Sequence, residues 1–263
     1  MILLDSAACE TRIFLTGGAA QGRRRMAWKR IKKLVGKNME YLFDGISIQN
    51  GRNVNMDSLL LTERTINGIS SVLAVVCDGV GSMSDGAYAS SVTVKLLNEW
   101  FESIDSTERA GLKLRDTILN INTEIVRTAG IKGLQTATTL SALMFVGEKY
   151  FVVHAGDSRI YTSSDKGLVL LTVDSVTETG KLTSYIGRRD NPELFYSEGE
   201  ASNGVFLLCS DGLYKRTTAA WLWQNINADN RKSIRKTLNN LSGFAIKQGE
   251  LDNISIAIVK TMK

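Results

Sequence analysis

Short apolar runs alternate with polar turns along most of the chain, from Tyr41 to Lys263. The runs are rich in Val, Ile, Leu, Phe and Thr and have the length of β-strands. We predict strands at residues 42–48, 57–62, 70–77, 138–146, 150–155, 158–163, 168–172, 204–209 and 253–260. Because the turns at 145–150 and 163–167 are too short for a crossover helix, the middle strands are predicted to form an antiparallel meander.

Three longer segments, at residues 86–103, 108–128 and 230–247, repeat apolar residues at the spacing of an amphipathic helix. The first two come together between the strands predicted at 70–77 and 138–146. A pair of helices in that place favours antiparallel sheets with helices packed outside over a strict strand–helix alternation. The predicted fold class is therefore α+β.

The first 40 residues share neither pattern, so we predict a basic N-terminal extension at 1–40 and one domain at 41–263. Residues 23–37 hold eight Lys and Arg and no acid, and because the whole chain carries +5, the remainder carries −3. This distribution argues against a nucleic-acid partner. Two hypotheses stay open for residues 23–37: a solvated helix on its own domain, which we favour, or a contact with an acidic partner or membrane surface.

The composition is that of a globular protein, with 43% hydrophobic and 22% charged residues. Asp5 ends the first apolar run too early for a signal peptide, and no apolar run has the length of a transmembrane segment. The three cysteines are odd in number, and Cys77 and Cys209 lie inside apolar runs, as buried free thiols do. We therefore predict a cytoplasmic protein.

Several kinds of catalytic site are excluded by residues that the chain lacks. Its one histidine, His154, lies in an apolar strand pattern with no identifiable nucleophile, so we predict a structural role for it. None of the cysteines is followed by the arginine of a thiol phosphatase. A glycine-rich stretch near the N-terminus has Arg23 and Arg24 where a P-loop needs Lys and Ser or Thr.

Aspartates fall at the ends of predicted strands. Asp78 and Asp211 each follow an apolar run and precede a glycine, while Asp57 and Asp252 stand at strand starts. One Asp-Gly pair alone is ordinary turn chemistry. Several carboxylates gathered at one rim, without His or Cys, are the ligands that Mg2+ or Mn2+ prefers. Such ions can activate water and hold a phosphoryl oxygen.

Six short segments in this order resemble the metal-dependent protein phosphatases of type 2C, which act on serine and threonine. The segments are Arg52 to Asp57, Asp78 to Gly81, Ala137 to Leu140, Gly156 to Arg159, Ser210 to Leu213 and Asp252 to Ile254. The resemblance covers residues 41–263 and implies a bacterial-type member. It also implies two antiparallel sheets in a central sandwich, flanked by helices on both faces.

The resemblance assigns roles residue by residue. Asp78 bridges two Mn2+ or Mg2+ ions, the Gly79 carbonyl serves the second ion, and Asp211 and Asp252 bind the first. Asp57 acts through metal-bound waters, and Arg52 holds the substrate phosphate. Two roles stay open for Asp157, which are a weak third metal site and an ordinary turn. Thr138 and Thr139 are interpreted as packing residues.

Four departures from the family pattern bear on activity. Met56 replaces an acidic or amide residue, and its thioether is a poor ligand for a hard ion. Lys215 stands where relatives often have an aspartate for the third metal. Val80 replaces the histidine of many eukaryotic members, to which we attach little weight. The connection from Asp174 to Leu182 is short where relatives carry a longer stretch, so substrate selection is expected to differ.

The sequence thus predicts a metal-dependent phosphatase of phosphoserine and phosphothreonine in proteins, working by attack of metal-bound hydroxide. The expected partners are a phosphoprotein and a cognate Ser/Thr kinase or its targets. The alternative is a phosphatase-like binding or regulatory module with little or no turnover, which Met56 and Lys215 favour. A third hypothesis makes residues 23–37 the functional element, docking the domain on a membrane or acidic partner.

Overall fold

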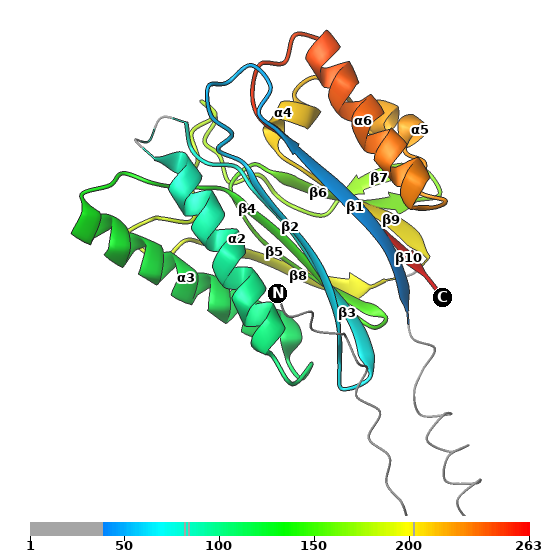
Figure 1. Ribbon diagram of the computed structural model, residues 1–263, viewed down its shortest axis with the longest axis horizontal. Helices are drawn as coiled ribbons and strands as arrows, with labels where there is room; N and C mark the ends of the chain where they lie inside the picture. The colour runs from blue at the N-terminus through cyan, green and yellow to red at the C-terminus, as the bar shows by residue number, and fades with distance from the viewer. Residues whose placement is uncertain (1–38, 82, 84, 202) are drawn as a thin grey trace, which may run out of the picture. The chain divides into compact units, whose positions relative to one another are not determined.

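The computed structural model describes residues 39–81, 83, 85–201 and 203–263 (Figure 1). The basic segment at 23–37 lies outside the described residues, so the hypotheses about it remain untested. Within the described part of the chain, no helix is long and apolar enough to cross a membrane.

Two five-stranded sheets form the centre of the fold, and every strand pairing within them is antiparallel. The first sheet has the order β1 (Glu40–Ile48), β10 (Ile254–Met262), β9 (Gly204–Cys209), β6 (Arg159–Ser164) and β7 (Gly167–Leu170). The second has the order β2 (Ser58–Ile66), β3 (Ile69–Cys77), β4 (Leu140–Val146), β5 (Lys149–Ala155) and β8 (Phe195–Glu200).

Helices cover the outer face of each sheet (Figure 1). The second sheet is covered by α2 (Gly86–Ser103) and α3 (Ala110–Lys132), and the first by α4 (Asp211–Tyr214), α5 (Ala219–Asn225) and α6 (Arg231–Lys247). Side chains seal the helix starts: Asp85 accepts from the Tyr88 amide in α2, and Asn230 and Ser233 form a reciprocal capping box in α6.

Alternation along the central strands builds the apolar layers. In β3, Leu73 and Val75 pack with the helices α2 and α3, whereas Val72 and Val76 pack between the two sheets. A third apolar layer joins the first sheet to α4, α5 and α6. Because β3 is buried on both faces, its sequence from Val72 onward is a continuous apolar run. The change from apolar to polar residues after Cys77 therefore marks the end of the strand in the sequence.

The predicted α+β fold with two antiparallel sheets and helices on both faces is confirmed. The predicted hairpins also form, since β4 pairs with β5 and β6 pairs with β7. The prediction of one meander through the middle strands is wrong, because the chain passes from the second sheet to the first between β5 and β6. Gly156, with φ of 106°, lies in that short connection, where its backbone allows the sharp change of direction.

Candidate active site

Segments that are far apart in the sequence meet at the same side of the sandwich. The register sets this: Ser58 of β2 lies opposite Cys77 of β3, and Ile48 of β1 lies opposite Ile254 of β10. The residues just outside these strand ends therefore share one rim, to which the end of β9 and the turn between β5 and β6 also contribute.

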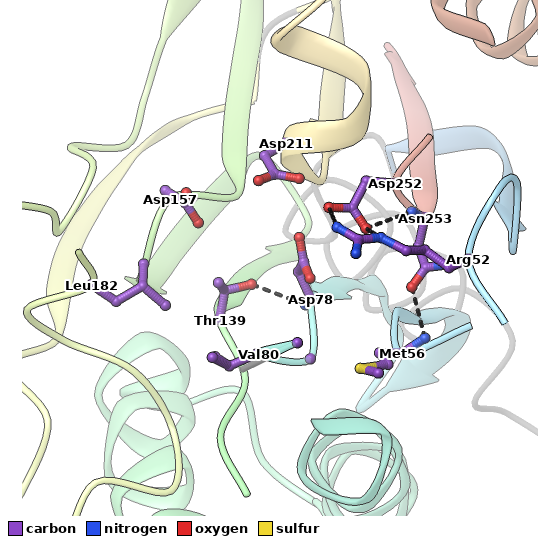
Figure 2. A pocket seen from close by; sticks show the side chains of 12 residues that line it. Arg52, Met56, Asp78, Val80, Thr139, Asp157, Leu182, Asp211, Asp252 and Asn253 are labelled. Carbon is purple, nitrogen blue, oxygen red and sulfur yellow. Dashed lines mark hydrogen bonds and ion pairs between the residues drawn. The ribbon is translucent and has the colours of Figure 1, made fainter. Parts of the chain in front are cut away.

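A pocket of about 190 Å3 opens at this rim (Figure 2). Its wall brings together six of the seven predicted site residues, which are Arg52, Asp78, Gly79, Asp157, Asp211 and Asp252. We call Asp57, Asp78, Asp157, Asp211 and Asp252 the carboxylate cluster. Figure 2 shows that Asp78, Asp157, Asp211 and Asp252 surround one space.

Asp57, the seventh predicted residue, does not line the pocket and is only 7% exposed. Its Oδ2 accepts a hydrogen bond of 2.9 Å from the Ser210 hydroxyl, while its Oδ1 is buried without a partner. Burial raises the pKa of Asp57 to about 6. Asp57 thus holds the start of β2 against the end of β9 and keeps one carboxylate oxygen unpaired.

The backbone of Asp78 is fixed from both sides. Its amide donates to the Thr139 hydroxyl at 2.9 Å, and its carbonyl accepts from the Thr138 hydroxyl at 2.9 Å. Burial, followed by the charges of Asp57 and Asp211, raises the pKa of the Asp78 carboxyl well above its usual range. Its carboxyl is thus held in a place where a negative charge lacks compensation.

Gly79 lies where backbones approach closely. A Cβ at this position would come within 2.6 Å of the Gly86 carbonyl oxygen. Only glycine therefore lets the chain leave β3 beneath the start of α2.

The two aspartates predicted to bind the first ion are each paired with a cationic side chain. Arg52 donates to both carboxylate oxygens of Asp252, at 2.9 and 2.7 Å, and Lys215 forms an ion pair with Asp211 Oδ2. Burial raises the pKa of Asp252, but the hydrogen bonds from Arg52 and the Asn253 backbone outweigh it and lower that pKa overall. Asp211 Oδ1 is buried without a partner.

Asp157 occupies the turn between β5 and β6 and lines the same pocket. Burial, and next the charge of Asp211, raises the pKa of Asp157 to about 6, although the Lys215 ammonium opposes this shift. The position is compatible with both roles left open from the sequence.

Asn253 lines the pocket but was not among the predicted site residues, although it stands in a quoted motif. Its side-chain amide donates to the carbonyls of Gln49 and Val54 at 2.7 and 3.2 Å and accepts from the Met56 amide at 2.9 Å. These bonds fold the loop that carries Arg52 against the start of β10. The only signal was an amide next to the motif aspartate.

A buried hydroxyl network lies beside the carboxylate cluster and consists of Thr139, Ser141, His154 and Ser158. Thr139 and Ser158 hydroxyls are 2.7 Å apart, Ser141 lies 3.0 Å from His154 Nδ1, and His154 Nε2 lies 3.0 Å from the Gly156 carbonyl. The Ser141 hydroxyl also lies 2.9 Å from the Ser158 carbonyl, and its one proton serves either that oxygen or His154 Nδ1. The network ties β4 to the turn that carries Asp157.

Ser141 and His154 form a pair but not a catalytic one. Both are fully buried, so no substrate reaches the hydroxyl. Burial lowers the pKa of His154 to about 4, which keeps the imidazole neutral. The predicted structural role of His154 agrees with this geometry.

Three of the four departures from the family pattern contribute to the pocket wall. Met56 and Val80 line it, and so does Leu182, which follows a short turn closed by the Thr177 amide on the Lys181 carbonyl. The short connection thus places an apolar side chain in the pocket wall.

The donor set fits a hard divalent cation. It consists of carboxylate oxygens, two of which are buried without a hydrogen-bond partner. Burial, followed by the charges of neighbouring carboxylates, raises the pKa of several members. As the described side chains stand, no group of three His, Cys, Asp or Glu residues is arranged to hold one ion. Arg52 engages both oxygens of Asp252 and Lys215 engages one oxygen of Asp211, so metal binding competes with these ion pairs.

Comparison with known proteins agrees with this site. The sequence model of the family described as Protein phosphatase 2C matches residues 48–244. The chain is 26% identical over 215 residues to the serine/threonine phosphatase stp of Listeria monocytogenes, with 72% of this chain and 84% of that protein covered.

A longer relative matches over part of its length. The chain is 23% identical over 215 residues to the serine/threonine protein phosphatase PstP of Mycobacterium tuberculosis, covering 71% of this chain and 40% of PstP. The solved catalytic domain of a PstP, in complex with two manganese ions, has a TM-score of 0.72 at 22% identity, with 86% of this chain and all of that chain covered. At this identity the structural likeness establishes the fold.

The family model spans most of the chain and includes the segments that hold Arg52, Asp57, Asp78, Asp157 and Asp211. The predicted membership is therefore confirmed, and with it the enzyme class and its use of Mn2+ or Mg2+. The chain belongs to the protein phosphatase 2C family of metal-dependent serine/threonine phosphatases.

Proposed function

We propose that this chain hydrolyses phosphoserine and phosphothreonine in proteins at the carboxylate cluster, with Mn2+ or Mg2+ bound there. The single observation that carries the proposal is the gathering of five carboxylates at one rim with two unpaired buried oxygens. Such a cluster is costly unless positive charge enters it. Divalent ions, when bound, polarise a phosphoryl oxygen and lower the pKa of bound water.

The residues at the site have different proposed roles. Asp78, Asp211 and Asp252 are the proposed metal ligands together with the Gly79 carbonyl, and Asp57 orients water from behind them. Because Asp57 is anchored by Ser210 through one oxygen, its other oxygen stays free for that task. Thr138 and Thr139 fix the Asp78 backbone, so this central ligand has little freedom to leave the site.

Arg52 is the proposed phosphate ligand. Its side chain is 57% exposed and lies beside the pocket, and its guanidinium already makes the two-pronged contact with a carboxylate that it would make with a phosphate. Release from Asp252 frees the guanidinium for substrate and the carboxylate for an ion. Metal binding and phosphate binding are then favoured together.

Two observations support the alternative of a binding or regulatory module. Asp211 and Asp252 are both paired with cations, and Met56 lends no oxygen side chain to the pocket. A chain that failed to load metal would retain the fold and a phosphate-sized pocket with Arg52 at its edge. Turnover, rather than binding, separates the two functions.

The finer assignments remain proposals. A cytoplasmic location, a cognate Ser/Thr kinase or its targets as partners, and a role in signalling follow from the sequence interpretation. The basic segment at 23–37 stays a candidate contact for an acidic partner or membrane surface. Replacing its eight Lys and Arg by Gln in the full chain tests this: lost localisation or partner capture with unchanged hydrolysis supports docking.

The test of the main proposal is steady-state hydrolysis of a phosphothreonine peptide with Mn2+, with Mg2+ and with chelator. We expect metal-dependent turnover that Asp211→Asn lowers by at least about 1,000-fold, because removing a ligand charge forfeits several kcal/mol of transition-state stabilisation. Asp165→Asn is the matched control, since Asp165 lies in the exposed turn between β6 and β7. Folded wild-type protein without turnover at millimolar metal would support the binding module instead.

A further inference from the structure

Lys215 stands one helical turn after Asp211. It follows α4 directly, and its backbone amide donates to the Asp211 carbonyl at 3.0 Å. This spacing carries the lysine side chain back along the helix, where its ammonium forms an ion pair with Asp211 Oδ2. The helical spacing alone therefore places the Lys215 ammonium on Asp211, a proposed metal ligand.

The ammonium also lies in the field of other members of the carboxylate cluster. Burial lowers the pKa of Lys215, but the hydrogen bond and charge of Asp211 and the charges of Asp157 and Asp252 outweigh it and raise that pKa. The lysine side chain is 55% exposed, whereas that of Asp211 is 13% exposed. The cation thus reaches in from the solvent side onto a largely buried carboxylate.

A divalent ion and this ammonium make opposing demands on one group. Asp211 has one oxygen on Lys215 and the other buried without a partner. An ion at Asp211 would place two cations on the same carboxylate, and their repulsion weakens the binding of whichever arrives second. Since Lys215 is tethered and solvent-accessible, it is able to swing away at the cost of the ion pair.

We propose that Lys215 is a built-in counter-ion that competes with the divalent cation for Asp211. This inference rests on the proposed function, because it takes Asp211 as a metal ligand. Lys215 stabilises the cluster when metal is scarce and raises the metal concentration at which the site fills. Lys215 thereby sets the concentration of Mn2+ or Mg2+ above which the enzyme becomes active.

The test is calorimetric titration of Mn2+ into the full chain at low ionic strength. Lys215→Gln removes the charge, and we expect it to lower the Kd for Mn2+ by about two- to fivefold, the range for a partly exposed ion pair. It is also expected to lower the melting temperature in chelator, because the carboxylates then repel one another. Lys215→Arg, which keeps the charge, is expected to stay within about twofold of wild type.

Lys232→Gln is the matched control, because it removes the same charge from the exposed first turn of α6. It should leave both the Kd and the melting temperature unchanged. The difference between wild type and Lys215→Gln should also shrink at high salt, since salt screens the ammonium.

Three outcomes would overturn the inference. Equal Kd values in wild type and Lys215→Gln would overturn it while leaving the proposed function standing. An unchanged Kd for Mn2+ with a raised KM for the phosphopeptide at saturating metal would make Lys215 a substrate ligand instead. Absence of Mn2+ binding in wild type and Lys215→Gln alike would overturn this inference and the proposed metal site together.

Discussion

Two groups of polar side chains, the hydroxyl network and the carboxylate cluster, lie side by side at one end of the sheets, and they are built in opposite ways. In the hydroxyl network, every side-chain polar atom lies within hydrogen-bond distance of another polar atom. In the carboxylate cluster, two buried oxygens have none, and burial together with neighbouring charges raises the pKa of Asp57, Asp78 and Asp157.

The contrast separates side chains that stabilise the fold, in the hydroxyl network, from side chains that the fold brings together at a binding site, in the carboxylate cluster. A satisfied polar network strengthens its members and fixes one arrangement of the chain. A crowd of buried carboxylates costs stability unless cations enter it. Thr139 joins the two groups, because its hydroxyl contacts both Ser158 and the Asp78 amide. Thr139 is thus the point of contact between the two groups.

Replacing Asp78 by Asn should give the largest effect and should move activity and stability in opposite directions. Turnover is expected to fall by at least about 1,000-fold with loss of the central ligand charge. In chelator, the free energy of unfolding is expected to rise by roughly 1–3 kcal/mol, since a buried charge with raised pKa is removed. Urea denaturation beside a peptide assay measures both, and a loss of stability would contradict the contrast.

Much of the site was predictable because strand ends are marked in the sequence. Buried strands such as β3 and β9 read as apolar runs, so Asp78 and Asp211 stand out where each run stops. The antiparallel register then brings the ends together. The family motifs added the prediction that these residues, although far apart in the chain, share one pocket.

The parts that were missed depend on tertiary contacts or on short, polar segments. The edge strand β8 is not apolar, containing Ser197, Glu198 and Glu200, and α4 has four residues, too few to show a helical period. The change of sheet between β5 and β6 is decided by packing rather than by turn length. Likewise, nothing local in the sequence pairs Arg52 with Asp252, since 200 residues separate them.

Replacing Ser141 by Ala should affect stability without affecting metal binding. The change leaves His154 Nδ1 and the Ser158 carbonyl without their buried partner, which is expected to cost about 1–3 kcal/mol of unfolding free energy. The Kd for Mn2+ should stay within about twofold of wild type. Ser91→Ala on the exposed face of α2 is the control and should change stability by less than about 0.5 kcal/mol.

Those two readouts decide what the hydroxyl network does. A Kd for Mn2+ raised tenfold or more by Ser141→Ala would show that the network acts on the ions as well as on the fold.

The smallest expected effect is a dependence of stability on pH through His154. Its pKa is lowered from 6.5 to about 4 by burial, so the unfolded chain takes up a proton at a pH where the folded chain does not. This contribution is present above pH 6.5 and is lost as the pH falls toward 4. Between pH 7 and 5.5 it amounts to about 1 kcal/mol.

The carboxylate cluster acts in the opposite sense. A carboxyl whose pKa is raised in the folded state stabilises the fold at low pH, and this contribution is lost as the pH rises. The histidine contribution is therefore measured as a difference between wild type and His154→Gln in chelator. Because this is the only histidine of the chain, no second imidazole confuses the comparison. Parallel pH profiles for the two proteins would contradict a neutral, buried imidazole.

The most direct test of the account is the melting temperature of the full chain with Mn2+ and with chelator, for wild type, Asp78→Asn and Ser141→Ala. Binding to the folded state stabilises it by about 2.7 kcal/mol at a metal concentration of 100 times Kd. The account predicts that Mn2+ raises the melting temperature of wild type and of Ser141→Ala by similar amounts and leaves Asp78→Asn unmoved. An equal rise in all three proteins, or no rise in wild type, would contradict it.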